Sequence, residues 1–104
     1  MRDIGKMMQQ ARKIQERAAK LQEDLRAERV EATAGGGVVR AVTNGHGEVL
    51  EVTIDPGVVD PADVSLLQDL VVAAVSEAQR TAKQLYEQRM KELAGGLGLP
   101  PGLI

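Results

Sequence analysis

The first segment of the chain carries apolar residues at alternating spacings of three and four positions. They are Ile4, Met7, Ala11, Ile14, Ala18, Leu21 and Leu25. This spacing places them on one narrow stripe of a helix, at the a and d positions of a heptad repeat. The segment 1–28 is therefore predicted to form a helix, starting near residue 3. Its stripe is predicted to be a seam against another helix, in the same chain or in a second subunit.

A strand pattern follows over residues 29–55. Apolar and polar residues alternate in RVEATA and in EVLEVTI, and VVRAVT between them is rich in β-branched residues. The sequence Asn44-Gly45-His46-Gly47 is a hairpin turn signal, and the glycines at 35, 36 and 37 favour a bend. We predict a three-stranded antiparallel meander here.

A second long helix is predicted over residues 60–94. Asp60 is expected as its N-cap and Pro61 as its first helical residue, since both types favour those positions. Its apolar face is broad at first and narrows after Ala78, which is typical of a helix that packs on a sheet and then runs past it. Gly95 and Gly96 are expected to end it, before an irregular tail over 95–104. The order α-β-β-β-α predicts a single α+β domain.

Composition limits the core of this domain. The 104 residues include one Tyr and neither Phe nor Trp, so the core must be aliphatic. With no Cys, the chain can form neither disulfides nor cysteine-based metal sites. The basic first twenty residues do not resemble a secretory signal, and no run is apolar enough to span a membrane.

Catalytic, metal and cofactor sites are not expected. The glycine triplet precedes strand residues, whereas a phosphate-binding loop needs a helix after it. His46 is the single histidine and lies at the predicted hairpin turn, where neither a second ligand nor a catalytic partner can be assigned. We therefore predict no enzyme activity, no metal, no cofactor and no small-molecule substrate.

The charges divide along the chain. Residues 1–29 hold eight basic and five acidic side chains, residues 30–79 one and eight, and residues 80–104 four and two. Lys6, Lys13 and Lys20 recur every seven residues, which is about 10.5 Å on one side of a helix. On the second helix Arg80, Lys83 and Lys91 share a quarter of the circumference. Such rows either bind a polyanion or are solvated helix faces, and charge alone leaves both interpretations open.

Five motifs in order extend over nearly the whole chain: MMQQARKIQERAAKLQEDL, AGGGVVRAVTNG, VTIDP, LLQDLVVAAVSEAQ and GGLGLPPGL. Together they resemble the YbaB/EbfC family of bacterial nucleoid-associated proteins. The resemblance implies a cytoplasmic, nucleoid-located homodimer whose two long helices project like tweezers. It also implies binding of double-stranded DNA with weak sequence preference, to compact or bridge DNA and influence gene expression.

The resemblance further implies that charged residues of the projecting helices bind DNA. The matching positions are Lys6, Arg12, Lys13, Arg17, Lys20, Arg80, Lys83, Arg89 and Lys91. Contacts of this kind would be made to phosphates, because the chain has no row of aromatic residues to stack on unpaired bases. An alternative function is a coiled-coil adaptor that grips a partner protein, which needs the helix seam but not the basic residues.

Overall fold

The structure, a computed structural model, describes residues 2–98 and confirms the α-β-β-β-α order. The elements are α1 (Arg2–Ala27), β1 (Val30–Ala34), β2 (Val39–Thr43), β3 (Val49–Ile54), the short 3₁₀ helix η1 (Pro56–Val58) and α2 (Val64–Gly96). The three strands form one antiparallel sheet in the order β1-β2-β3, as the alternating pattern predicts. The predicted tail lies outside the described residues from position 99 on.

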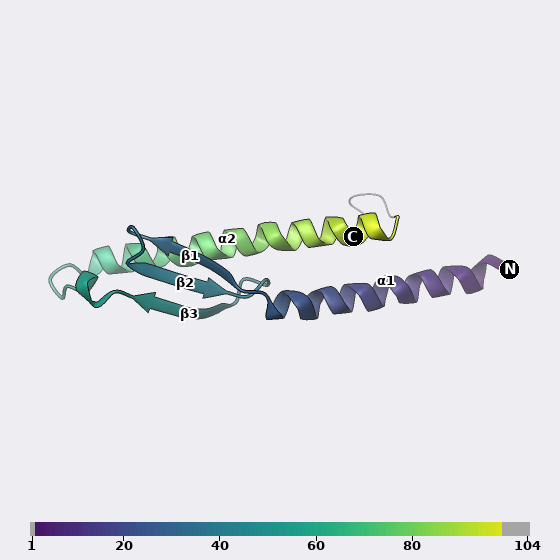
Figure 1. Ribbon diagram of the computed structural model, residues 1–104, viewed down its shortest axis with the longest axis horizontal. Coiled ribbons are helices and arrows are strands. Elements are labelled where there is room, and N and C mark those ends of the chain that lie inside the picture. The colour runs from purple at the N-terminus through teal and green to yellow at the C-terminus, as the bar shows by residue number, and fades with distance from the viewer. Residues whose placement is uncertain (1, 99–104) are drawn as a thin grey trace.

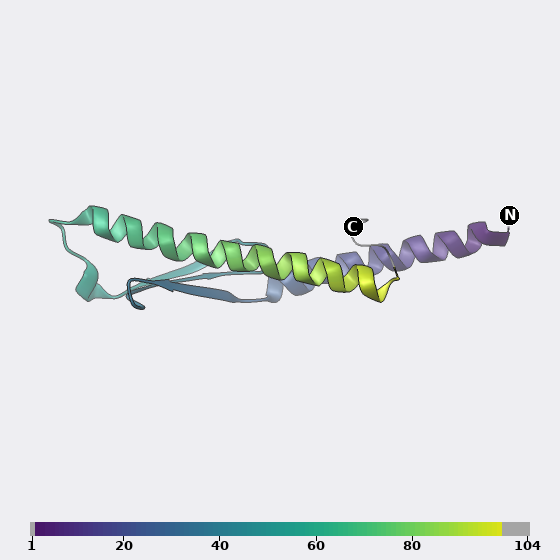
Figure 2. The same cartoon turned by 90° about the horizontal axis from the view of Figure 1, so that it is seen from above.

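The core lies between one face of the sheet and the first half of α2. Val39 and Ala41 of β2 pack against Ala74 and Ala78 of α2, and all four are fully buried. Alanine at the contact lets the helix backbone approach the sheet closely. Figure 2 shows α2 lying over the sheet as a second layer. Because α2 covers mainly β1 and β2, the edge strand β3 is left exposed along most of its length.

The glycine triplet forms the turn between β1 and β2, as predicted. Gly35, Gly36 and Gly37 have φ angles of 64°, 75° and 100°, a region that side chains with a Cβ rarely enter. Gly35 also lies against Leu70 of α2, where a Cβ would come within 2.8 Å of the Leu70 Cδ2 atom. The triplet is therefore a bend that fits under α2, not a phosphate-binding loop.

The predicted start of the second helix is wrong by one turn. Asp60 does not cap α2; it closes a turn in which its Oδ1 atom accepts from the Ala62 amide, 2.9 Å away. Asp63 is the N-cap, with its Oδ1 atom accepting from the Leu66 amide at 3.3 Å. Both aspartates can cap a helix, but the Asp63 amide donates to the Asp60 carbonyl oxygen at 2.9 Å, so a separate turn comes first and α2 begins after it. The helix also continues through Gly95 and Gly96 to a cap at Leu97.

The turn between β2 and β3 holds the end of α1. The Gly45 amide donates to the Leu25 carbonyl oxygen at 2.7 Å, and His46 Nε2 donates to the Gln22 carbonyl oxygen at 3.0 Å. Asn44 is buried, and its Oδ1 atom accepts from the His46 amide at 2.9 Å, which shapes the turn. Carbonyl groups at a helix C-terminus need donors from elsewhere. The Gly45 amide supplies one to Leu25 in the last turn, and His46 adds a bond one turn earlier, so the β2–β3 turn fixes α1 to the sheet.

The two helices extend from the sheet in the same direction as two arms (Figure 1). The molecule measures 73 × 20 × 16 Å and has a radius of gyration of 19.7 Å, against about 13 Å for a compact chain of this length. Its accessible surface is 7310 Å², whereas a compact monomer of 11.1 kDa exposes about 5,700 Å². The fold therefore leaves an unusually large surface uncovered.

Candidate nucleic-acid interface

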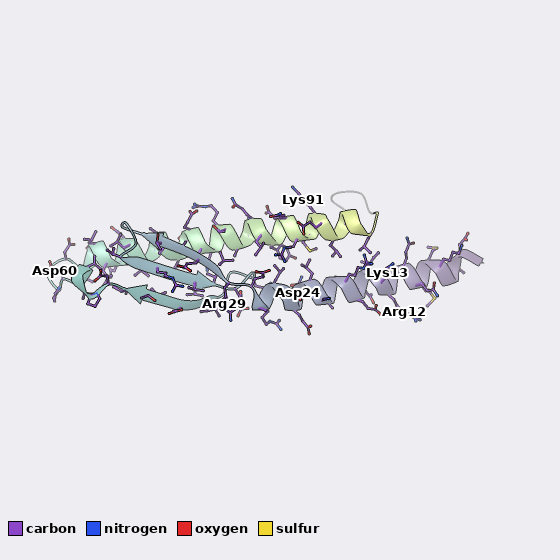
Figure 3. The ribbon with its side chains drawn as sticks, in the orientation of Figure 1. Arg12, Lys13, Asp24, Arg29, Asp60 and Lys91 are labelled. Carbon is purple, nitrogen blue, oxygen red and sulfur yellow. The ribbon has the colours of Figure 1, made fainter. Side chains whose placement is uncertain are left out.

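The basic side chains of α1 lie along an exposed helix. Lys6, Lys13 and Lys20 recur every two turns on one side and are all exposed. Figure 3 shows that Arg12 and Lys13 project from different sides of α1. Arg17 is exposed on the side near the end of α2, close to Gly96. The cations of α1 therefore form a band around part of the helix rather than a single row.

The basic residues of α2 divide into two groups. Arg80, Lys83 and Lys91 are exposed on the side away from Ala74 and Ala78, which pack on the sheet, and Lys91 points away from α1 in Figure 3. Arg89 is nine residues after Arg80 and therefore faces the opposite side of the helix. There its Nη2 atom lies 2.9 Å from Glu28 Oε1, and both side chains are half-buried. Arg89 thus joins the two arms at their base.

Most of the candidate DNA-binding cations have no acidic partner. Arg80 pairs with Glu77 one turn away, and Arg89 pairs with Glu28. Seven others make no ion pair with a carboxylate of residues 2–98: Lys6, Arg12, Lys13, Arg17, Lys20, Lys83 and Lys91. A cation with only water around it can exchange that water for a phosphate without first breaking an ion pair. The seven exposed cations are therefore the groups best placed to bind a polyanion.

The sheet offers no comparable group. Its only cation, Arg40, donates to both carboxylate oxygens of Glu31, and its Nη1 atom lies 3.8 Å from Glu51 Oε2. The hydrogen bond from Arg40 holds the pKa of the Glu31 carboxyl below its usual value, and the same bond raises the pKa of Arg40. With Arg40 neutralised in this way, the outer sheet face is acidic.

The structure also shows a feature that the sequence patterns did not predict. An open cleft of about 400 Å³ lies between the β2–β3 turn and α2, lined by Gly45, His46, Gly47, Gln79, Lys83 and Tyr86. It brings the one histidine and the one tyrosine together with a candidate DNA-binding lysine. The lining residues of the turn and of α2 are at least 32 positions apart, so no local spacing could have indicated the cleft.

The residues of the predicted seam on α1 are buried to different extents. Leu25 is fully buried under the β2–β3 turn, and three residues before it on the stripe are half-buried: Ile14, Ala18 and Leu21. Ile4 and Met7, at the outer end of α1, are 55% and 64% exposed. The seam therefore changes along its length, from a covered base to an open end.

Other kinds of site can be judged over the described part of the chain. Among residues 2–98, no three side chains of His, Cys, Asp or Glu are grouped to hold a metal ion. No helix of this region has the length and apolar character that crossing a membrane requires. The exposed basic arms are the main chemical feature that remains.

Comparison with known proteins gives the family. A model described as the YbaB/EbfC DNA-binding family matches residues 1–97. The chain belongs to this family. The YbaB/EbfC family is a nucleoid-associated, DNA-binding family and not a family of enzymes, which confirms the prediction that the protein is not an enzyme.

Relatives within this family are similar in sequence to this chain along nearly their whole lengths. A nucleoid-associated protein of Syntrophobacter fumaroxidans is 48% identical, covering 93% of this chain and 92% of the relative. One of Chloroflexus aurantiacus is 52% identical, covering 88% and 91%. The fold also resembles the crystal structure of an uncharacterized protein from Helicobacter pylori, with a TM-score of 0.73 at 17% identity over 89% of this chain and 95% of that one.

Proposed function

We propose that the protein binds duplex DNA through phosphate contacts made by the exposed cations of its two helical arms. The observation that carries this proposal is the set of seven arm cations that have no carboxylate partner within residues 2–98. Membership of a DNA-binding family supplies the class of partner. Arg80 can join the set once it leaves Glu77, whereas Arg89 serves mainly to hold the arms together.

Binding through phosphate contacts would have weak sequence preference. Lysine and arginine on a straight helix reach the backbone of DNA, which is alike for every sequence. Reading bases would need side chains that enter a groove in a fixed orientation, and most of these cations are on long, solvated side chains without a supporting bond. Stacking on unpaired bases is also disfavoured, because Tyr86 is the only aromatic residue. Binding of this type is strongly salt-dependent.

The cellular role follows from this mode of binding. A protein that contacts any duplex along its backbone coats, compacts or bridges DNA, and can alter gene expression by occupying promoters. The relatives named as nucleoid-associated proteins support a place in the nucleoid.

A homodimer is part of the proposal. Val49, Leu50 and Val52 of the edge strand β3 are 44%, 48% and 38% exposed, and Val72 of α2 is 63% exposed. Val72 lies two turns before Gln79, whose side chain donates to the Gly47 carbonyl oxygen, so Val72 is on the side of α2 that faces β3. Exposed apolar residues on an unpaired sheet edge are typical of a subunit interface. A second copy placed there would double the number of basic arms.

The test removes two arm cations. We expect Lys13→Gln with Lys20→Gln to weaken DNA retardation in a gel and to reduce the slope of log affinity against log salt by about two. The matched control is Thr33→Glu with Ser65→Glu, which changes the net charge by the same amount at exposed positions away from the cationic arm surfaces. Equal weakening by both pairs would mean that net charge, not the α1 surface, governs binding.

A further inference from the structure

The outer end of α1 has an apolar face that nothing in the described chain covers. Ile4, Met7 and Met8 are 55%, 64% and 55% exposed, and Ala11 beside them is exposed too. Their spacing of i, i+3, i+4 and i+7 puts all four on one side of the helix. We call these four residues the tip face. Three large apolar side chains gathered on a helix end, rather than scattered over the surface, indicate a contact.

The tip face continues a seam that is already in use. The same heptad stripe is half-buried at Ile14 and Leu21 and fully buried at Leu25. The end of α2 lies beside Arg17, and α1 extends beyond it as a single helix (Figure 1). The inner part of the stripe is covered by neighbouring elements, which shows that this apolar face can pack. The same spacing continues into the open outer part, so we expect that part to pack against another helix.

We infer that the tip face packs antiparallel against the tip face of a second copy that belongs to another dimer. A parallel arrangement would run the two helices together past Ile14, where α2 of each chain already lies beside the stripe. An antiparallel overlap is confined to residues 4–11 and leaves the two sheets at opposite ends. The contact is two-fold symmetric, so Met7 of one copy lies next to Met7 of the other.

Charge allows this pairing. In the heptad that starts at Ile4, the positions flanking the seam within the overlap are Met8 and Gln10, and both are neutral. Lys6 lies farther round the helix, at position c, so its charge is not forced against the other copy. The basic residues that would bind DNA thus remain outside the contact. Tip pairing and phosphate binding can occur together.

The size of the tip face sets the strength of the contact. Four side chains per copy cannot bury the roughly 1,200 Å² of a stable interface, so free protein should associate only weakly. Dimers bound to neighbouring DNA are held close together, so the effective concentration of their tip faces is high. This proximity favours the tip contact even though the contact itself is weak. The pairing itself does not require DNA, but its consequence, the bridging of two duplexes, rests on the proposed DNA binding.

A single introduced thiol tests the pairing, because the chain has no cysteine. Met7→Cys is compared with Gln9→Cys, which is exposed at position f on the opposite side of the helix. Under mild oxidation we expect Met7→Cys to form at least five times more covalent dimer than Gln9→Cys. The yield should rise with protein concentration and with added duplex, and native mass should exceed that of the unlinked protein.

Two results would overturn the inference. Equal yields from the two variants would mean random collision of flexible arms. A high yield from Met7→Cys that is independent of concentration, with native mass unchanged, would mean that the tips of one dimer meet each other.

A bridging assay separates this contact from DNA binding itself. Met7→Gln with Met8→Gln removes the apolar face without altering a charge, and its helix content can be checked by circular dichroism. We expect retardation of a single duplex within about two-fold of the wild type, and capture of a second duplex on beads reduced at least five-fold. Undiminished capture would contradict the inference. Failure of the wild type to retard DNA would refute the proposed function, while the thiol experiment would still decide the tip contact.

Discussion

At the scale of single residues, Gly45 shows how close the β2–β3 turn lies to α1. A Cβ built there would be 2.7 Å from the Leu25 carbonyl oxygen and 2.8 Å from the Leu25 Cδ2 atom. The backbone of Gly45 has no positive φ, so glycine is needed for space and not for conformation. The short approach also permits the Gly45 amide to donate to Leu25.

Gly45→Ala is therefore expected to destabilise the protein by about 1–3 kcal/mol, the usual cost of an added atom in a close-packed contact. Gly5→Ala is the matched control, since no atom within 4 Å would meet its Cβ and alanine favours a helix interior. That variant should be stabilised by about 0.5–1 kcal/mol. Chemical denaturation measures both, and equal stability of Gly45→Ala and the wild type would show that the turn does not press on α1.

The Glu31–Arg40 pair gives a prediction for pH. The folded pKa of Glu31 lies below its ordinary value of 4.5, so the pair contributes to stability above that value and the contribution is lost as the pH falls through the folded pKa. Carboxyl NMR should show the Glu31 midpoint moving upward in Arg40→Gln. In Glu51→Gln it should stay low, because the direct hydrogen bonds of Arg40 go to Glu31. An unchanged midpoint in Arg40→Gln would exclude Arg40 as the cause.

At the scale of elements, the relation between the two arms depends on few contacts. The end of α1 is bonded to the β2–β3 turn through Leu25 and Gln22, and Glu28 just beyond it pairs with Arg89 of α2. Farther out, the stripe residues are only half-buried. The base of the arms is thus fixed, while their outer ends are held mainly by the stiffness of each helix.

A double-mutant cycle on Glu28→Gln and Arg89→Gln is expected to give a coupling of about 0.5–1 kcal/mol, because the pair is half-buried. The corresponding cycle on Glu77 and Arg80, which are more exposed, should give less, about 0.3–0.5 kcal/mol for neighbours on one helix. Urea denaturation of the single and double variants measures both. A larger coupling for Glu77 and Arg80 would show that the bond across the arms contributes little.

At the scale of the whole molecule, the surface that remains uncovered is the main consequence of the fold. A narrow sheet with one helical layer hides only one of its faces, and α2 leaves β3 aside. An extended chain of this size has little core of its own. The proposed second copy against β3 would bury the exposed apolar residues of that strand.

Val72→Lys is expected to weaken the proposed dimer, because it places a charge on the apolar surface beside β3. Sedimentation at several concentrations should show that the dissociation constant of the dimer rises at least ten-fold. Ala73→Lys, one residue further on and also exposed, faces a different side of α2 and should leave the dimer intact. If both variants had the same dimer dissociation constant, the interface would have to lie elsewhere.

The sequence by itself determined the elements of this protein. The heptad spacing predicted α1, the alternating residues predicted the strands, and the glycine triplet and Asn44-Gly45-His46-Gly47 located the turns. These signals are local, because helix and strand periods and positive φ angles depend on residues close together in the chain. The family was also accessible from the sequence, through a resemblance that the family match confirms, whereas the DNA-binding role of the candidate cations stays a prediction.

Only the tertiary structure decided what those elements do to one another. It chose Asp63 over Asp60 as the cap of α2, paired Arg89 with a glutamate 61 positions away, and joined His46 to the end of α1. The Asp63 cap is a local bond to the Leu66 amide, whereas the other two pairs join residues that are distant in the chain and meet only in the folded protein. Periodicity predicts which side of a helix is apolar, but the neighbouring elements determine how much of that side remains open.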